Sequence, residues 1–282
     1  MMTIFCCEKK DSEKPFIMKR ETKIEWFALS LALSLFFGVV RHSAAVDLGG
    51  EKLDITLDFT YATQYMWHGY DLYNGHGGFQ PSIRADYRGF CLGLWGSWTD
   101  HAGFDDQTEL DYYAGYGRSL FDEERYQLDL HLLYTYFSFP KIDSRYDLQE
   151  VAVGFALPKL IPIGPACLVP RYDVFFDWAG VEGGNRMEGG WFHTLGLSYD
   201  LPIPALIPDQ KEQSLSFSWD ITYNDGALGS NPGWSHITVG VSTQFEWKEV
   251  YFIPAVRYQW SLEETVDPED EFYATFSVGY KF

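Results

Sequence analysis

Ionisable side chains recur at every second position in several segments of this chain, which is the spacing of one face of a β-strand. Glu109 and Asp111 form one such pair, and Arg171 and Asp173 form another. Charged groups on one strand face must meet water or one another, so they favour a polar interior over an apolar core. We predict that twelve residues line this interior: Asp58, Arg84, Asp86, Glu109, Asp111, Asp129, Glu150, Arg171, Asp173, Asp177, Asp220 and Arg257.

Acids outnumber bases on this predicted face, so a hydrated interior would raise the local concentration of cations. A network of ion pairs that closes the interior is the alternative, and both stay open. Bulky side chains on the same predicted face would narrow any passage: Trp95, Tyr113, Phe137, Phe175, Phe192, Tyr251 and Tyr273.

Histidines are the other candidates for chemistry. A lipid-hydrolysing site on the apolar face would need a serine beside His193, and the residues expected to surround it include none. Asp129 and His131 lie two residues apart and could orient a base. His68 and His76 could bind a metal, but no cysteine or histidine spacing supports a metal motif. We therefore predict no enzyme activity, no metal site and no cofactor.

A series of alternating segments must position these residues. The clearest is C-terminal, where four apolar residues share one face: Phe276, Val278, Tyr280 and Phe282. This face resembles the signal by which outer-membrane barrels are recognised for assembly, so we expect the barrel assembly machinery as a partner. Alternation with period two predicts twelve strands, at 53–67, 80–88, 90–99, 108–118, 125–138, 147–157, 166–178, 190–201, 213–224, 235–247, 249–261 and 271–282.

This pattern predicts an all-β fold: a single antiparallel transmembrane β-barrel of about twelve strands. Aromatic residues make up 18% of the chain and gather near the ends of the predicted strands, as in membrane girdles. A soluble β-sandwich would have an equally apolar core face and is the rival fold. An even strand number places both termini on the periplasmic side, so residues 68–79 are expected to form an outer loop.

The first 45 residues have the composition of a targeting segment. An apolar run at 26–40 is followed by small residues at 43–45, and three basic residues precede it: Lys19, Arg20 and Lys23. We predict a cleaved signal peptide at 1–45 and an outer-membrane barrel at 46–282. An N-terminal anchor helix is the alternative, although the run is shorter than the ~20 residues that a membrane helix needs.

Three further features bound the class of protein. Met18 is an alternative start, which would leave residues 1–17 outside the translated chain. The net charge of −19 argues against binding nucleic acid, which requires a basic surface. Cys91 and Cys167 fall on the third and seventh predicted strands, too far apart for a disulfide, so we predict two free thiols that face inward.

Several segments resemble the TorF-type family of outer-membrane proteins. That family's pattern opens with an aromatic strand that runs into Tyr-x-x-Arg-Gly, here 64–70 with His68 in place of arginine. A proline-containing strand follows at 79–83, then Gly-Phe-Tyr-x-Gly-x-Trp-Gly-Ser at 89–97 with cysteine for tyrosine, then an acidic and aromatic strand at 109–116. The resemblance implies an outer-membrane barrel with channel function and no established catalytic residues.

The sequence therefore predicts an outer-membrane, porin-like channel that is narrow and favours cations, for passive passage of small solutes or ions. A filled structural or surface-interaction barrel without transport is the alternative, and a lipid-modifying enzyme of the outer membrane is a further one. Expected partners are outer-membrane lipid, the assembly machinery and small solutes or ions. Neither the solute nor the oligomeric state follows from the sequence.

Overall fold

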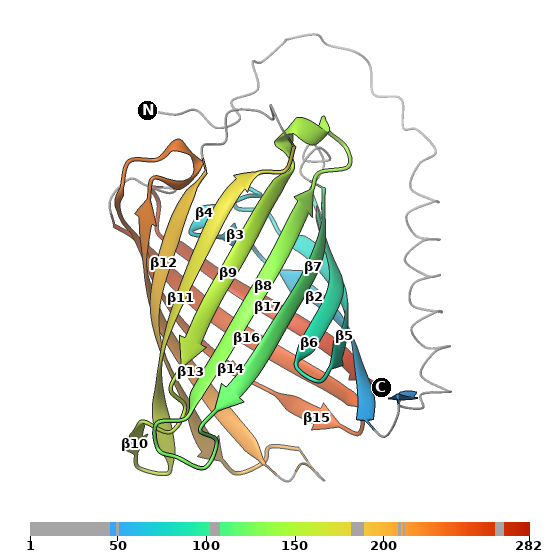
Figure 1. The fold of residues 1–282 in the computed structure, drawn as a ribbon, viewed down its shortest axis with the longest axis vertical. Helices are drawn as coiled ribbons and strands as arrows, with labels where there is room; N and C mark the ends of the chain where they lie inside the picture. Colours follow the sequence, from blue (N-terminus) through green and yellow to red (C-terminus); the bar gives the residue numbers. More distant parts are fainter. Residues whose placement is uncertain are drawn as a thin grey trace. The chain divides into compact units, whose positions relative to one another are not determined.

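Long antiparallel strands close into a barrel in a computed structural model of the chain (Figure 1). The barrel belongs to the unit Ala45–Phe282. The structure describes residues 46–48, 51–101, 108–181, 189–207, 210, 212–262 and 268–282. The predicted signal peptide at 1–45 lies outside the described residues.

Each strand of the barrel wall pairs with the next one along the chain, and the first also pairs with the last. The wall strands are β2 (Glu51–Ala62), β5 (Gly78–Tyr87), β6 (Phe90–Thr99), β7 (Glu109–Leu120), β8 (Leu128–Ser138), β9 (Leu148–Ala156), β11 (Ala166–Ala179), β12 (Gly190–Ile203), β13 (Gln213–Asp225), β14 (Gly233–Thr243), β16 (Val250–Ser261) and β17 (Glu271–Lys281). Pairing of β17 with β2 leaves the wall without an open edge. The predicted antiparallel barrel of twelve strands is confirmed within the described part of the chain.

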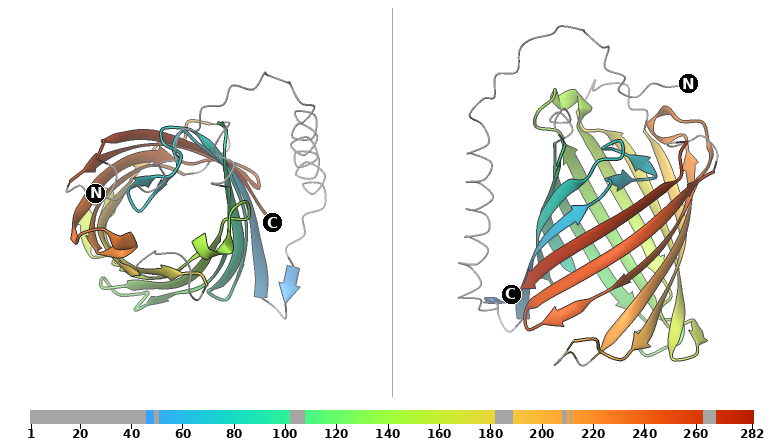
Figure 2. Two further views of the ribbon diagram at one scale, coloured as in Figure 1. Left: turned by 90° about the horizontal axis from the view of Figure 1, so that it is seen from above. Right: turned by 180° about the vertical axis from the view of Figure 1, so that it is seen from behind.

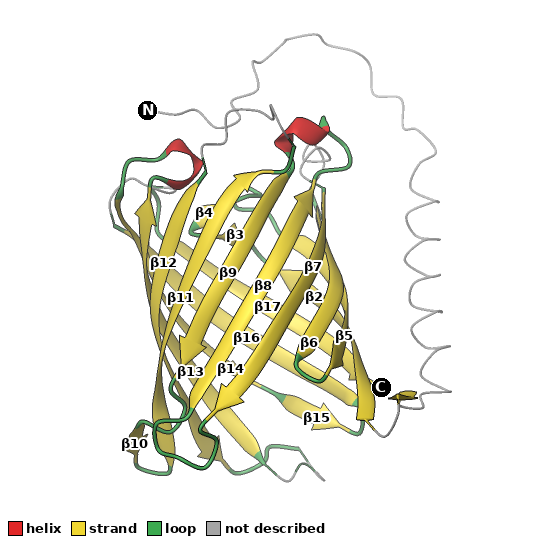
Figure 3. Ribbon diagram, viewed as in Figure 1, coloured by secondary structure: helices red, strands yellow, loops and turns green. Residues whose placement is uncertain are grey.

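Shorter elements extend the wall or lie apart from it. Three short strands pair with wall strands: β1 (Val46–Leu48), β10 (Ile161–Ile163) and β15 (Phe245–Trp247). A separate hairpin consists of β3 (Met66–Trp67) and β4 (Tyr70–Asp71). The two 3-10 turns, η2 (Ser144–Tyr146) and η3 (Ala227–Gly229), are at the end of the barrel opposite the C-terminus (Figure 3). In the described ranges, no helix has the length and apolar character needed to cross a membrane.

The two faces of the wall have the reverse polarity of a soluble protein. Large apolar side chains are widely exposed on the outside; for example, Leu92 is 65% and Phe272 is 66% exposed. The residues buried on the inside include carboxylates: Glu109, Asp111, Glu150, Asp173 and Asp177. A soluble protein rarely exposes so much contiguous apolar surface, so the outer face is suited to an apolar surrounding. The rival β-sandwich is not the fold that forms.

Two glycines of the wall make room for tyrosine rings on neighbouring strands. Gly93 of β6 lies opposite Tyr113 of β7, and Gly279 of β17 lies opposite Tyr251 of β16. A Cβ at Gly93 would be 2.1 Å from the ring of Tyr113, and one at Gly279 would be 2.0 Å from the ring of Tyr251. Each ring thus covers a glycine across the strand pair, an arrangement that fixes strand register.

Substitution of Gly93 tests how much the contact between glycine and tyrosine contributes to the stability of the folded barrel. We expect Gly93→Val to destabilise the folded barrel by about 2 kcal/mol, because the new side chain must displace the Tyr113 ring. Gly117→Val is the matched control, since the nearest atom to a Cβ there is 3.6 Å away. Urea unfolding in detergent micelles, followed by tryptophan fluorescence, measures the free energy of unfolding of both variants. Equal unfolding midpoints for Gly93→Val and Gly117→Val would contradict the expectation.

The first wall strand ends earlier than the sequence predicts. Alternation extended it to residue 67, but β2 ends at Ala62, which lies opposite Gly78 of β5. If alternation continued to residue 67, Tyr65 and Trp67 would share the apolar outer face of this strand with Tyr61. They lie inside instead: Tyr65 is buried and Trp67 lines an internal cavity. Burial of these aromatic rings outweighs the local strand propensity of the segment.

Candidate functional site

Residues 63–77, here called the inward loop, connect two wall strands inside the barrel. The loop leaves β2 and returns to β5 at the same level, because Ala62 and Gly78 are cross-strand partners. Seen along the barrel, its β3–β4 hairpin lies within the ring of strands (Figure 2). The loop expected at 68–79 is therefore corrected in its bounds, which are 63–77, and in its course, because its aromatic residues pack on the inner wall. Its place on the outer side of the membrane stays a prediction.

Aromatic contacts hold the tip of the inward loop against the far wall. The His68 ring stacks on Phe192 of β12, with centroids 4.2 Å apart and an interplanar angle of 7°. His68 also contacts Phe175 of β11 edge to face, with ring centroids 4.7 Å apart. Trp67 contacts Phe137 of β8 in the same way, with ring centroids 5.7 Å apart. The loop therefore reaches from β2 across the interior to strands on the opposite side.

Hydrogen bonds fix the loop at further points. The side-chain amide of Gln259 on β16 donates to the carbonyl oxygen of Gly69 at 2.8 Å. The hydroxyls of Tyr73 and Ser97 lie 2.7 Å apart in a buried contact. Burial also raises the pKa of the Tyr73 phenol above its ordinary value, so this group keeps its proton to higher pH than an exposed tyrosine does. The loop is thus a structured part of the interior.

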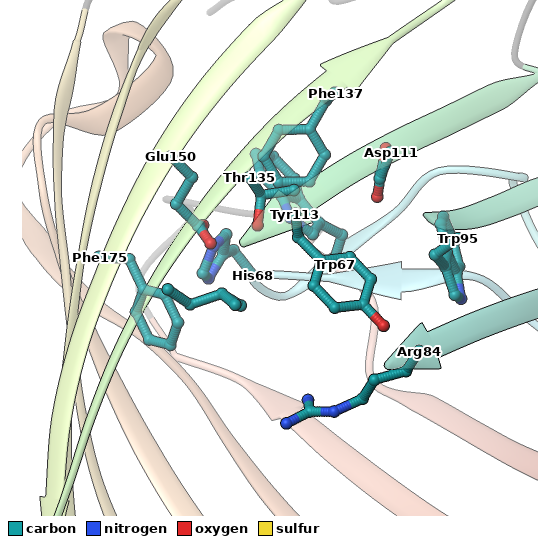
Figure 4. A pocket seen from close by; sticks show the side chains of 11 residues that line it. Trp67, His68, Arg84, Trp95, Asp111, Tyr113, Thr135, Phe137, Glu150 and Phe175 are labelled. Atoms are coloured by element: carbon teal, nitrogen blue, oxygen red, sulfur yellow. The ribbon is translucent and has the colours of Figure 1, made fainter. Parts of the chain in front are cut away.

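An open cavity of about 360 Å³ adjoins the inward loop (Figure 4). A water molecule takes up ~30 Å³ in the liquid, so the cavity has room for a small hydrated solute. Its lining mixes aromatic and ionisable side chains: Trp67, His68, Arg84, Trp95, Asp111, Tyr113, Leu133, Thr135, Phe137, Glu150 and Phe175.

Strand register places the predicted interior residues on one face of the wall. Arg84, Asp111 and Glu150 line the cavity itself. Residues directly opposite in a β-ladder point to the same side, as do residues two apart on one strand. By this rule the remaining nine share the face of these three: Asp58, Asp86, Glu109, Asp129, Arg171, Asp173, Asp177, Asp220 and Arg257. Their part in the passage of a solute stays a prediction.

An ion-pair network on this face joins side chains from three strands, β8, β11 and β13. Arg171 donates hydrogen bonds to Asp173 on its own strand and to Asp220 on β13. His131 of β8 lies 3.3 Å from the same Asp173. Asp173 is buried, so its charge depends on these partners.

The two histidines considered for catalysis have other partners. His131 Nε2 lies 3.3 Å from Asp173 Oδ1 on β11, and Asp129 instead accepts a hydrogen bond from Gln127. The Nδ1 atom of His193 lies 2.7 Å from the hydroxyl oxygen of Tyr172, a tyrosine rather than a serine. Cys91 and Cys167, by contrast, are free thiols as predicted.

The structure also assembles a cluster that the sequence did not predict. Donor atoms of His68, Glu150 and Asp177 all lie within 4.8 Å of one another. Glu150 of β9 and Asp177 of β11 are direct cross-strand partners, and His68 Nε2 lies 2.7 Å from Glu150 Oε2. The predicted hairpin of 147–157 with 166–178 could have paired the two acids. No local signal, however, placed His68 inside the barrel.

Comparisons with known proteins find solved structures of similar fold, three of which follow. No family model matches the chain, and no curated relative does. The chain is similar to the KdgM porin (12% identity, TM-score 0.49, 80% of this chain and 99% of that chain). It is similar to the NanC porin (10% identity, TM-score 0.49, 80% of this chain and 98% of that chain). It is also similar to an outer-membrane channel from Pseudomonas putida F1 (13% identity, TM-score 0.49, 84% of this chain and 100% of that chain). These identities are too low to transfer a function, and the TorF-type resemblance stays a prediction.

Proposed function

We propose that the chain is an outer-membrane, porin-like channel for passive passage of small solutes or ions. The observation that carries the proposal is a closed barrel with an apolar exterior and an ionisable inner face that borders an open cavity. Lipid provides no hydrogen bonds to backbone groups, and a closed barrel pairs them all within the wall. Charged groups at membrane depth must face inward, and strand register puts the twelve predicted interior residues on one face of the wall.

The apolar exterior and the ionisable inner face also support an outer-membrane location. The segments near the two ends of the chain have proposed roles in export and assembly. Residues 1–45 would direct export and then be removed. Phe276 is 50% exposed on the last wall strand, and Phe282 follows that strand directly. With Val278 and Tyr280, these residues would present the C-terminal strand to the assembly machinery.

The inward loop supports a narrow passage. It crosses the interior and is held at both the near and the far wall, so a solute must pass beside it. The carboxylates beside the loop, Asp111 and Glu150, support a preference for cations. The tight attachment of the loop also favours a second candidate, a structural barrel that the loop closes to transport.

Single-channel recording separates the two candidates. The protein is inserted into a planar bilayer with a KCl gradient, and discrete conductance steps with a cation-favouring reversal potential are the expected result. An anion-favouring potential would contradict the assignment of selectivity to the acidic residues. Folded, inserted protein without steps would establish the closed, structural barrel.

A further inference from the structure

We propose that His68, Glu150 and Asp177 form a binding site for a divalent transition-metal ion such as Zn²⁺, which fastens the inward loop to the barrel wall. An imidazole nitrogen combined with carboxylate oxygens is a donor set that suits zinc, manganese or iron(II), whereas calcium and magnesium prefer oxygen alone. The site does not depend on whether the barrel conducts.

Asp177 is the residue that most needs a cation. Its side chain is 1% exposed, and no described residue donates a hydrogen bond to either of its oxygens. A buried carboxylate without a partner is strongly unfavourable. Glu150 lies directly opposite it on β9, and like charges in this position repel each other. A metal ion between the two carboxylates would satisfy Asp177 and remove the repulsion.

Two arginines of the inner face are engaged with other acids. Arg84 pairs with Asp86 at 2.7 Å, and Arg171 pairs with Asp220. Within the cluster itself the only nitrogen donor is His68, a single imidazole facing two carboxylates. Two carboxyl groups therefore share a single imidazole at this point of the interior.

The geometry requires only small side-chain movements to hold an ion. Tetrahedral zinc with ligands at ~2.1 Å keeps its donor atoms ~3.4 Å apart. The 2.7 Å contact between His68 and Glu150 would open by ~0.7 Å, and Asp177 would approach by at most ~1.4 Å. Figure 4 shows the side chains of His68 and Glu150 directed toward one another, and both line the cavity, which gives an ion a path of entry.

The loop presents His68 in a fixed orientation. The residue has a φ of 45° at the turn between β3 and β4, in the left-handed region that histidine adopts more readily than most residues. Stacking on the fully buried Phe192 fixes the plane of its ring. Supporting contacts of this kind are what orient the ligands of metal sites.

Zinc titration of the full chain tests the site. The protein is purified in detergent, stripped with a chelator and titrated with Zn²⁺ by calorimetry. We expect one ion per chain, and affinity at least ~10-fold weaker in the isosteric variant Asp177→Asn. His193→Gln, which removes an outer-face histidine, is the matched control and should bind as the wild type does. Co²⁺ in place of Zn²⁺ should give visible absorption bands that His68→Gln abolishes.

Two results would overturn the proposal: the absence of a saturable site in the wild type, or equal affinity in the wild type and Asp177→Asn. Folding of each variant is checked by its migration on gels before and after heating. Glu150→Gln provides a second isosteric test if Asp177→Asn does not fold. Because the titration reads binding alone, a barrel without conductance would overturn the proposed channel and leave the metal site standing.

Discussion

Removal of the inward loop is expected to increase single-channel conductance by about threefold or more, because the loop crosses the interior and narrows the path for ions. Residues 64–76 can be replaced by a short turn of glycine and asparagine, since Ala62 and Gly78 are already cross-strand partners and a tight turn joins such positions. The pairing of β2 with β5 and β17 would persist, so the barrel should still form. Planar-bilayer recording under symmetric KCl measures the change.

A control must alter a loop without altering the interior. Asp143 and Arg145 pair in the exposed turn between β8 and β9, with side chains that are 54% and 56% exposed. Their joint replacement by alanine is expected to leave conductance unchanged. If the loop-deleted barrel inserts and conducts no better than the wild type, the inward loop is not the constriction.

The second large effect concerns the stability of the wall. Arg171→Met should destabilise the barrel by about 2 kcal/mol, since it leaves Asp173 and Asp220 without their shared cation. This figure lies below the usual range for a fully buried pair because the Arg171 side chain is 36% exposed. Guanidinium unfolding in detergent, followed by tryptophan fluorescence, measures the loss.

Removal of the unpaired negative charges of Asp173 and Asp220 should restore much of the lost stability. The triple variant with Asp173→Asn and Asp220→Asn added is expected to recover more than half of the loss, because neutral amides carry a smaller desolvation penalty. Arg84→Met is the matched control: Arg84 and Asp86 are both partly exposed, so its effect should stay below about 1 kcal/mol. Equal losses for Arg171→Met and Arg84→Met would show that the network does not stabilise the wall.

The wall of the barrel could be predicted from sequence because its signal is local. Alternation along 213–224 and 271–282 already separates an apolar from a polar face, and the observed β13 and β17 occupy nearly these ranges. The same two-residue alternation predicts which side chains point into the barrel. Asp111 and Glu150 were expected inside for this reason, and both line the cavity.

The inward loop could not be predicted in this way. Tyr65 and Trp67 continue the alternation of β2, so period alone extends the strand past Ala62. Their true partners lie far along the chain; Trp67 contacts Phe137 and Phe192, for example. The cluster of His68 with Glu150 and Asp177 depends on that placement. Of this cluster, only the pairing of Glu150 with Asp177 could be predicted from the sequence.

The enclosure of the inward loop also constrains the order in which the barrel can fold. The loop follows the first wall strand, yet its tip packs on β11 and β12, which come much later in the chain. The seam between β2 and β17 joins the two ends of the wall, so it forms only when the last strand is present. The tip of the loop can reach its partners only after β11 and β12 are in place, which makes these distant contacts part of a slow, late step in folding.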